Sequence, residues 1–114
     1  MEAGSTVILI DGDSRRRAAI SHSLSGSGLH IEPFETIEEL GAHWPRAATI
    51  LVHDDGGIVK ELIQLIAAKG EWLPVVAFAE APPPARIVEA ILEGAVDYLV
   101  WPFTAESLGA SLDK

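Results

Sequence analysis

The sequence predicts an α/β fold, in which five parallel strands form a doubly wound sheet with helices on both faces. Two observations lead to this prediction. Apolar, β-branched runs without polar alternation are typical of strands that are buried on both faces of a parallel sheet. Between these runs lie segments whose apolar residues recur at the spacing of amphipathic helices. Regular alternation of strand and helix indicates a parallel sheet that is covered by helices on both sides.

The first strand and the first helix lie close to the amino terminus. Thr6–Ile10 is a continuous apolar run and predicts a buried strand. Asp13 or Ser14 can cap the helix that follows, because a short side chain with an oxygen accepts a bond from the free amides of the first turn. We expect this helix over about 15–25. Arg15–Arg17 are expected on its exposed face, and an ion pair between these arginines and nearby acids is an open alternative.

The second strand differs from the others. Leu29–Phe34 alternates apolar and polar residues and contains a proline, which suits a short strand at the edge of the sheet. Thr36 and Glu39 then form a capping box, in which each side chain accepts a bond from the other residue's backbone amide. The second helix is expected to carry Trp44 on its apolar face and to end at Pro45.

The rest of the chain repeats the alternation of strand and helix. Buried strands are predicted over 48–52, 74–79 and 96–100, and Thr104 is expected to cap the last helix. The apolar residues that define the remaining helices are Ile58, Leu62 and Ile66, then Val88, Ile91 and Leu92, and finally Leu108 and Leu112. Right-handed crossovers leave few ways to wind such a chain, and we predict the flavodoxin-like strand order 2-1-3-4-5.

Acidic residues follow two strands that this order makes neighbours. Asp11 and Asp13 come after the first strand, and Asp54 comes after the third. Ligands of open α/β sheets bind at the carboxyl ends of the strands, so we expect these carboxylates to converge there. Such a cluster can hold a hard cation such as Mg²⁺, and one carboxylate can act as a nucleophile toward a phosphoryl group.

Composition limits the classes of protein. The 114 residues predict one domain over 1–114 with its core at about 6–113, and the absence of cysteine excludes thiolate chemistry. Seventeen acidic and eight basic residues give a net charge of −9, which argues against direct nucleic-acid binding. We expect no membrane segment, because no apolar run approaches about 20 residues, and no signal peptide, because Met1–Ser5 carries no basic residue. A cytoplasmic location is therefore expected.

Four stretches of the sequence are similar to the receiver domains of two-component response regulators. They are Ile8–Asp13, Ile50–Asp54, Glu93–Leu99 and Trp101–Phe103, and the resemblance runs from about 7 to 112. Gly-Ala-x-Asp-Tyr, followed closely by x-Pro-Phe, is its most specific part. The resemblance implies a signalling module of the (βα)5 fold, in which an aspartate accepts phosphate from the phosphohistidine of a sensor kinase.

The resemblance also places the phosphoacceptor and the metal site. Asp54 stands where the family has its phosphoaccepting aspartate, and Asp11 matches the first acid of the pair that holds Mg²⁺. Gly12 replaces the second acid of that pair, which weakens the metal site, and Asp13 lies one residue too far along. Mg²⁺ therefore stays open as a cofactor, with Asp11, Asp13 and Asp54 as its candidate ligands.

Two further positions depart from the family pattern. Ala79 stands in place of the Thr or Ser whose hydroxyl binds the phosphoryl group, and Trp101 replaces the lysine before Pro102. Tyr98 matches the switch aromatic of the family, but Ala79 offers no hydroxyl that could couple to it. Phosphoryl transfer depends on positioning and on stabilising nearly two negative charges. We therefore expect weak phosphorylation of Asp54 or none. We expect the Trp101 indole to seal the pocket, with packing against the last helix in the core as the alternative.

These residues leave three functions open. The leading hypothesis is an atypical receiver domain that acts through protein–protein contacts. The alternatives are a conventional Mg²⁺-dependent phosphoacceptor at Asp54 and a small-molecule-binding module on the same flavodoxin-like fold. An enzyme that turns over free substrates is not expected, because the sequence offers no pair of nucleophile and base.

The resemblance implies partners as well. A sensor kinase or another signalling protein is expected to bind the chain. A homodimer is one hypothesis, through the face formed by the helix around 88–92, the strand 96–100 and the last helix. An output domain, with DNA binding among the options, is expected to follow the last helix in the natural protein.

Overall fold

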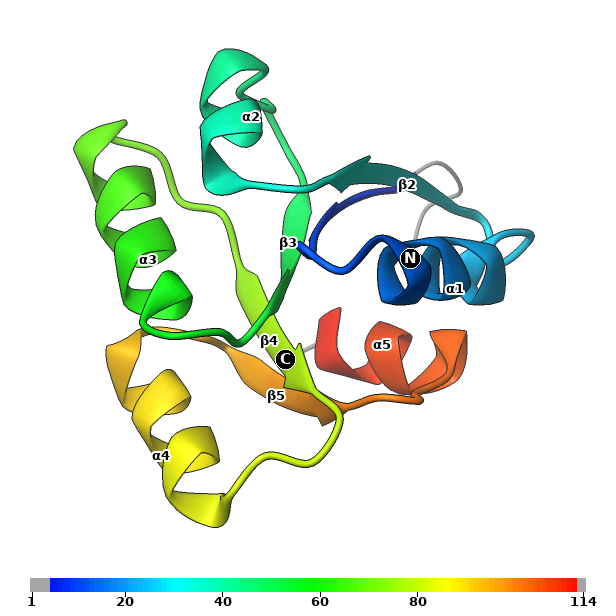
Figure 1. The fold of residues 1–114 in the computed structure, drawn as a ribbon. Helices are drawn as coiled ribbons and strands as arrows, with labels where there is room; N and C mark the ends of the chain where they lie inside the picture. Colours follow the sequence, from blue (N-terminus) through cyan, green and yellow to red (C-terminus); the bar gives the residue numbers. More distant parts are fainter. Residues whose placement is uncertain (1–4, 113–114) are drawn as a thin grey trace.

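The computed structural model describes residues 5–112, which alternate strand and helix throughout (Figure 1). The strands are β1 (Ser5–Ile10), β2 (Leu29–Phe34), β3 (Thr49–His53), β4 (Val75–Ala79) and β5 (Asp97–Val100). The helices are α1 (Ser14–Leu24), α2 (Ile37–Ala42), α3 (Ile58–Ala68), α4 (Pro84–Glu93) and α5 (Ala105–Leu112). The structure does not describe residues 1–4 and 113–114. The ends of the predicted domain 1–114 therefore lie outside the described residues, as do the first four residues of the segment in which no signal peptide is expected.

The five strands form one parallel sheet in the order β2-β1-β3-β4-β5, which confirms the predicted fold class and strand order. β2 lies at an edge, and its Pro33 pairs in register with Leu9 of β1. An edge strand tolerates proline because one side of its backbone needs no partner in the sheet. β1 and β3 are neighbours in the centre, with Ile10 opposite Val52. Their carboxyl ends therefore lie side by side.

Helices cover both faces of the sheet, and the strand residues alternate between two apolar clusters. Ile10 and Val52 pack under α2, α3 and α4, whereas Leu9, Leu51 and Phe78 pack under α1 and α5. Figure 1 shows this division, with α1 and α5 on one side and the other three helices on the opposite side. Within residues 5–112, no helix is both long enough and apolar enough to cross a membrane.

Side chains cap three helices as the sequence predicts. Asp13 accepts a hydrogen bond of 2.9 Å from an amide in the first turn of α1, so it is Asp13 and not Ser14 that caps this helix. Thr36 and Glu39 form the full capping box at α2. Thr104 accepts a bond of 3.0 Å from an amide in the first turn of α5. These bonds supply partners for amides that the helices themselves leave open.

The second helix is shorter than predicted. α2 ends at Ala42, so Trp44 lies beyond the helix and not on its apolar face. Pro45 explains the early end, because a proline disfavours the helical conformation of the residue before it. His43 has already left the helix, with φ −133° and ψ 59°. Trp44 still packs against the core, so the prediction of its burial is right although its element is wrong.

Candidate functional site

The acids that the sequence places at the strand ends are held there by the sheet itself. The amide of Asp11 donates to the carbonyl of Phe34 at 3.1 Å, and the amide of Asp54 donates to the carbonyl of Phe78 at 2.8 Å. The hydrogen bonding of the sheet thus continues one residue beyond β1 and β3. The carboxylates of Asp11 and Asp54 are almost fully buried, with 0% and 2% of the side chain exposed. A buried carboxylate needs charged or hydrogen-bonding partners.

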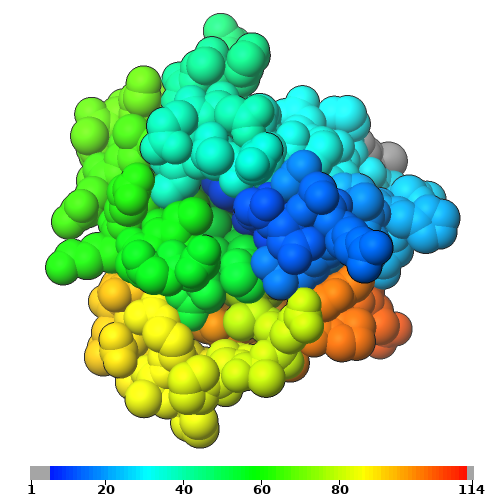
Figure 2. Space-filling view, viewed as in Figure 1, coloured from blue at the N-terminus to red at the C-terminus, as the bar shows by residue number. Residues whose placement is uncertain are grey.

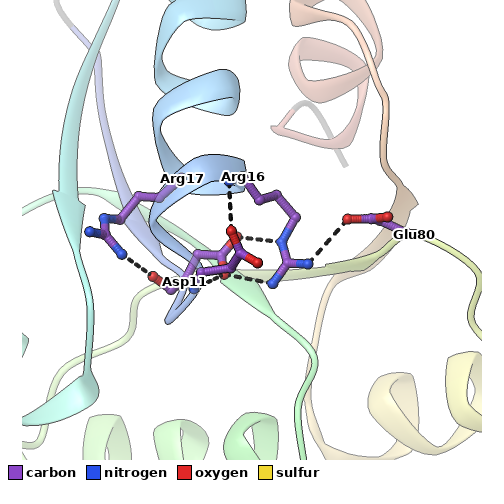
Figure 3. A network of polar contacts seen from close by, with 5 residues as sticks. Asp11, Arg16, Arg17 and Glu80 are labelled. Atoms are coloured by element: carbon purple, nitrogen blue, oxygen red, sulfur yellow. Dashed lines mark hydrogen bonds and ion pairs between the residues drawn. The ribbon is translucent and has the colours of Figure 1, made fainter.

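Asp11 is paired with an arginine of α1. Arg16 donates from Nε to Oδ2 at 2.6 Å and from Nη2 to Oδ1 at 2.8 Å (Figure 3). The amide of Asp13 donates to the same Oδ1 at 2.9 Å, and Arg17 donates to the Asp11 carbonyl at 2.6 Å. Arg16 also reaches across the site to Glu80 at 3.1 Å. We call Asp11, Arg16 and Glu80 the Asp11 network.

Asp54 is paired in the same way from the other side. Arg86, in the first turn of α4, donates from Nε to Oδ2 at 2.8 Å and from Nη2 to Oδ1 at 2.9 Å. The hydroxyl of Tyr98 on β5 donates to Oδ2 at 2.7 Å. Glu93 and Glu89 accept further bonds from Arg86, at 3.0 and 3.3 Å. We call Asp54, Arg86 and Tyr98 the Asp54 network.

The charges in both networks are strongly stabilised. The hydrogen bond to Asp11 raises the pKa of Arg16 above its usual range, and the bonds to Asp54 and then to Glu93 do the same for Arg86. Burial, and after it the bond to Asp54, raises the pKa of the Tyr98 phenol. At neutral pH both guanidinium groups are therefore charged, and the phenol of Tyr98 is neutral and donates its proton to Asp54.

Comparison with known proteins finds similar response regulators, although no protein-family model matches the chain. Response regulator protein FleR of Pseudomonas aeruginosa is 33% identical over 106 residues, which are 90% of this chain but 22% of FleR. A response regulator receiver protein from Pseudoalteromonas atlantica has a TM-score of 0.76 at 23% identity, over 95% of this chain and 93% of that one. The chemotaxis protein CheY4 of Vibrio cholerae has a TM-score of 0.76 at 24% identity, over 97% and 98%.

The chain has the fold of response-regulator receiver domains and is similar in sequence to a response regulator. The chain spans about a fifth of the length of FleR. The amino-terminal domain of FixJ has the same fold, with a TM-score of 0.79 at 20% identity, over 96% of this chain and 90% of that one.

The chain departs from the pattern of receiver domains at Gly12, Ala79 and Trp101. Gly12 is exposed, and Ala79 ends β4 with its carbonyl bonded to the amide of Trp101. The Trp101 indole packs edge to face on Phe103, 5.0 Å between ring centres, on the α1 and α5 side of the sheet. This packing favours the core alternative over a seal above Asp54. The peptide bond between Trp101 and Pro102 is cis.

The three candidate Mg²⁺ ligands, all among the described residues, are not arranged as a metal site. Asp13 is exposed and caps α1, and the bond from the Arg16 amide lowers the pKa of its carboxyl. Asp11 and Asp54 each face an arginine. Among residues 5–112, no group of three or more His, Cys, Asp or Glu side chains is arranged to hold a metal ion. The Mg²⁺ site therefore stays a prediction, because Arg16 and Arg86 would first have to leave the carboxylates of Asp11 and Asp54.

A pocket of about 290 Å³ opens beside the acids, between the loops that follow β1, β2 and β3. Asp11 and His53 line it together with Thr36 and Asp55, whereas Asp54 is absent from its described walls. The Asp54 carboxylate instead meets Arg86 on α4. The hypothesis of a small-molecule site on this fold stays a prediction.

Sequence reasoning anticipated one of the two arginines in part and missed the other. Pairing of Arg15–Arg17 with nearby acids is an alternative that the sequence leaves open. Arg16 realises it with the carboxylate of Asp11, whereas Arg17 donates to the backbone carbonyl of Asp11. Arg86 has no motif around it. The one sequence feature that could have pointed to Arg86 is its isolation, because it is the only basic residue between 70 and 113. A lone cation among acids and apolar residues is a natural partner for a buried carboxylate.

Proposed function

We propose that this receiver domain signals through protein–protein contacts, with Asp54 held by an internal ion pair and phosphorylated weakly or not at all. The observation that carries the proposal is the bidentate pair between Arg86 and Asp54, with Tyr98 as a third donor. The site that would receive a phosphoryl group is therefore already neutralised by the chain's own side chains.

Phosphorylation would first have to break this pair. An attacking carboxylate needs a free oxygen, and both oxygens of Asp54 accept hydrogen bonds. Bonds to charged groups contribute about 1.5–3 kcal/mol each, so releasing Arg86 adds to the barrier of the transfer. The metal that would offset the phosphoryl charge also needs Asp11, which Arg16 occupies.

The same pair supports a preset conformation. Arg86 joins the first turn of α4 to the end of β3, and Tyr98 points inward to the same carboxylate. In the proposal, α4 and β5 are held in one arrangement without phosphate, and a sensor kinase or another signalling protein recognises that arrangement. The expected output domain, homodimer and cytoplasmic location stay predictions.

One observation favours the conventional phosphoacceptor as the second candidate. The Arg86 side chain is 24% exposed, so its guanidinium lies at the rim and has a path outward. A displaced Arg86 could then pair with a phosphoryl group on Asp54 and supply the positive charge that Trp101 does not. The two candidates differ in whether the unmodified chain responds to a phosphoryl mimic.

An amide NMR titration with Mg²⁺ and then beryllofluoride, a phosphoryl mimic, tests the proposal. We expect the unmodified chain to show no shifts around Asp54 at millimolar ligand, and we expect Arg86→Gln to gain them. Arg15→Gln, which removes an exposed arginine of α1, is the matched control and should behave as the unmodified chain. Shifts in the unmodified chain that disappear in Asp54→Ala would refute the proposal and establish the conventional phosphoacceptor.

A further inference from the structure

The chain contains two pairs in which an aspartate directly precedes a glycine, and both lie at strand ends. Asp11-Gly12 follows β1, and Asp55-Gly56 follows the end of β3. All four residues line the pocket of about 290 Å³ beside the acids. Figure 2 shows the blue segment after β1 and the green segment after β3 next to each other on one face of the molecule. The same reactive group thus occurs twice in one site.

An aspartate that precedes a glycine rearranges without an enzyme. The amide nitrogen of the glycine attacks the side-chain carboxyl carbon, a C–N bond forms, and the carboxyl hydroxyl leaves as water with the amide proton. Water then opens the resulting succinimide ring at either carbonyl, which returns aspartate or gives isoaspartate, whose backbone runs through the former side chain. Glycine favours the attack because no Cβ shields its nitrogen and its backbone adopts conformations that other residues avoid.

The fold holds the carboxylate of Asp11 away from this reaction. The side chain is 0% exposed, and it accepts bonds from Nε and Nη2 of Arg16 at 2.6 and 2.8 Å and from the amide of Asp13 at 2.9 Å. The carboxyl carbon reaches the amide of Gly12 only after the carboxylate has left these donors. Losing two bonds to a charged donor corresponds to a rate about a hundredfold lower or less, because each bond is equivalent to about a factor of ten or more.

The carboxylate of Asp55 has no such restraint. Asp55 is exposed, and no described residue forms a hydrogen bond or an ion pair with its side chain. The amide of Gly56 likewise donates to no group within residues 5–112. Gly56 and Gly57 have φ +53° and +84°, and a Cβ at either would meet no atom within 4 Å. The turn therefore has room to bring the nitrogen of Gly56 onto the carboxyl carbon of Asp55.

We propose that Asp55-Gly56 is a modification site at which the folded chain forms isoaspartate, whereas Arg16 protects Asp11-Gly12 from the same reaction. The only co-reactant is water, and the product keeps the mass and the formal charge of the chain. The backbone between β3 and α3 gains a methylene group, and the free carboxylate moves to the Cα of residue 55.

The expected consequence is a change in the pocket and not in the Asp54 network. Asp55 and Gly56 are walls of the pocket, and the carbonyl of Asp55 accepts a bond of 3.2 Å from the amide of Ile58 at the start of α3. Asp54 precedes the inserted methylene, and its amide stays bonded to the carbonyl of Phe78. The inference therefore goes beyond the proposed function and does not depend on it.

The test incubates the full chain in mildly acidic buffer and maps its peptides at intervals. Isoaspartate appears as a peptide of unchanged mass and altered retention, and its fragment ions identify the position. We expect it at Asp55 and at least about a hundredfold less of it at Asp11, which keeps two bonds to Arg16. The same chain unfolded in guanidinium chloride has lost these contacts and should form isoaspartate at both positions at similar rates.

Two variants complete the test. Asp55→Glu keeps the charge at an exposed position, but glutamate closes a larger ring more slowly, so the signal at residue 55 should disappear. Arg16→Gln should raise the isoaspartate at Asp11 in the folded chain, and an unchanged amount there would refute the protection by Arg16. The inference is also wrong if the folded chain forms no isoaspartate at Asp55, or forms as much at Asp11.

Discussion

The guanidinium of Arg86 donates two hydrogen bonds, of 2.8 and 2.9 Å, to the carboxylate of Asp54, a residue 32 positions earlier in the chain. Arg16 makes the same bidentate contact with Asp11. Asp11 and Asp54, the two buried acids among the candidate site residues, are thus each matched by one arginine of the chain. The site is electrostatically complete without a ligand, and several consequences can be measured.

Removal of the Arg86 guanidinium should destabilise the domain. Arg86→Gln leaves the Asp54 carboxylate, 2% exposed, without its ionic partner. We expect the free energy of unfolding to fall by about 1.5–3 kcal/mol, the contribution of hydrogen bonds to a charged group. Urea unfolding measures the change as a lower midpoint at constant m value. Arg86→Gln should lower the free energy of unfolding by less when it is made in Asp54→Asn. If the effects of the two substitutions simply add in the double variant, the ion pair between Arg86 and Asp54 does not exist in solution.

The ionisation of Tyr98 can be followed without interference, because it is the only tyrosine of the chain. Burial and the bond to Asp54 raise its pKa above the ordinary value of about 10. The folded chain then holds the phenol proton more tightly than the unfolded chain does. Its contribution to stability is therefore complete below about pH 10 and is lost as the pH rises further. Absorbance at the tyrosinate band should show no ionisation at about pH 10.

Asp54→Asn is the companion variant for this titration. Removing the acceptor charge takes away the second cause of the raised pKa but keeps the first, which is burial. We expect the Tyr98 transition to move down toward the ordinary value without reaching it. An unchanged transition in Asp54→Asn would mean that the phenol does not donate to Asp54 in solution.

Gly12 gives access to the missing metal ligand. A Cβ at Gly12 meets no atom within 4 Å, so an aspartate fits there without displacing the backbone. Gly12→Asp combined with Arg16→Gln supplies a second acid and frees Asp11, and we expect the affinity for Mg²⁺ to rise by about tenfold or more, since affinity follows the number of charged ligands. Isothermal titration with MgCl₂ measures it. Gly41→Asp, at another open glycine, controls for added charge, and equal affinities in the two variants would exclude a site at Asp11.

Two glycine-to-alanine variants should have opposite signs. Gly94 caps α4 with φ +123°, and a Cβ there would lie 3.2 Å from three atoms of Ile63. We expect Gly94→Ala to cost about 1–3 kcal/mol, because the conformation is strained for any residue with a side chain. Gly41 lies within α2 in open space, and Gly41→Ala should stabilise by about 0.5–1 kcal/mol. Thermal or urea unfolding of the pair checks both signs.

Local sequence was sufficient for the elements and their ends. The apolar runs at β1 and β3 predict buried strands, and Asp13, Thr36 and Thr104 cap the helices that were expected to follow them. Each of these predictions depends on residues within a few positions of one another. The prediction that placed Trp44 in the second helix is wrong for an equally local reason. Pro45 outweighs the apolar spacing that favoured a longer helix.

The sequence by itself determined the fold class, the strand order and the place of Asp11 and Asp54 at adjacent strand ends, because periodicity and the handedness of crossovers act through short stretches of chain. Only the tertiary structure decided what those acids face. Arg86 reaches Asp54 because α4 packs against β5 and α3, and Trp101, which follows β5, packs on Phe103 on the α5 side of the sheet. Ion pairs between distant residues depend on packing in three dimensions, and a sequence pattern does not carry that information.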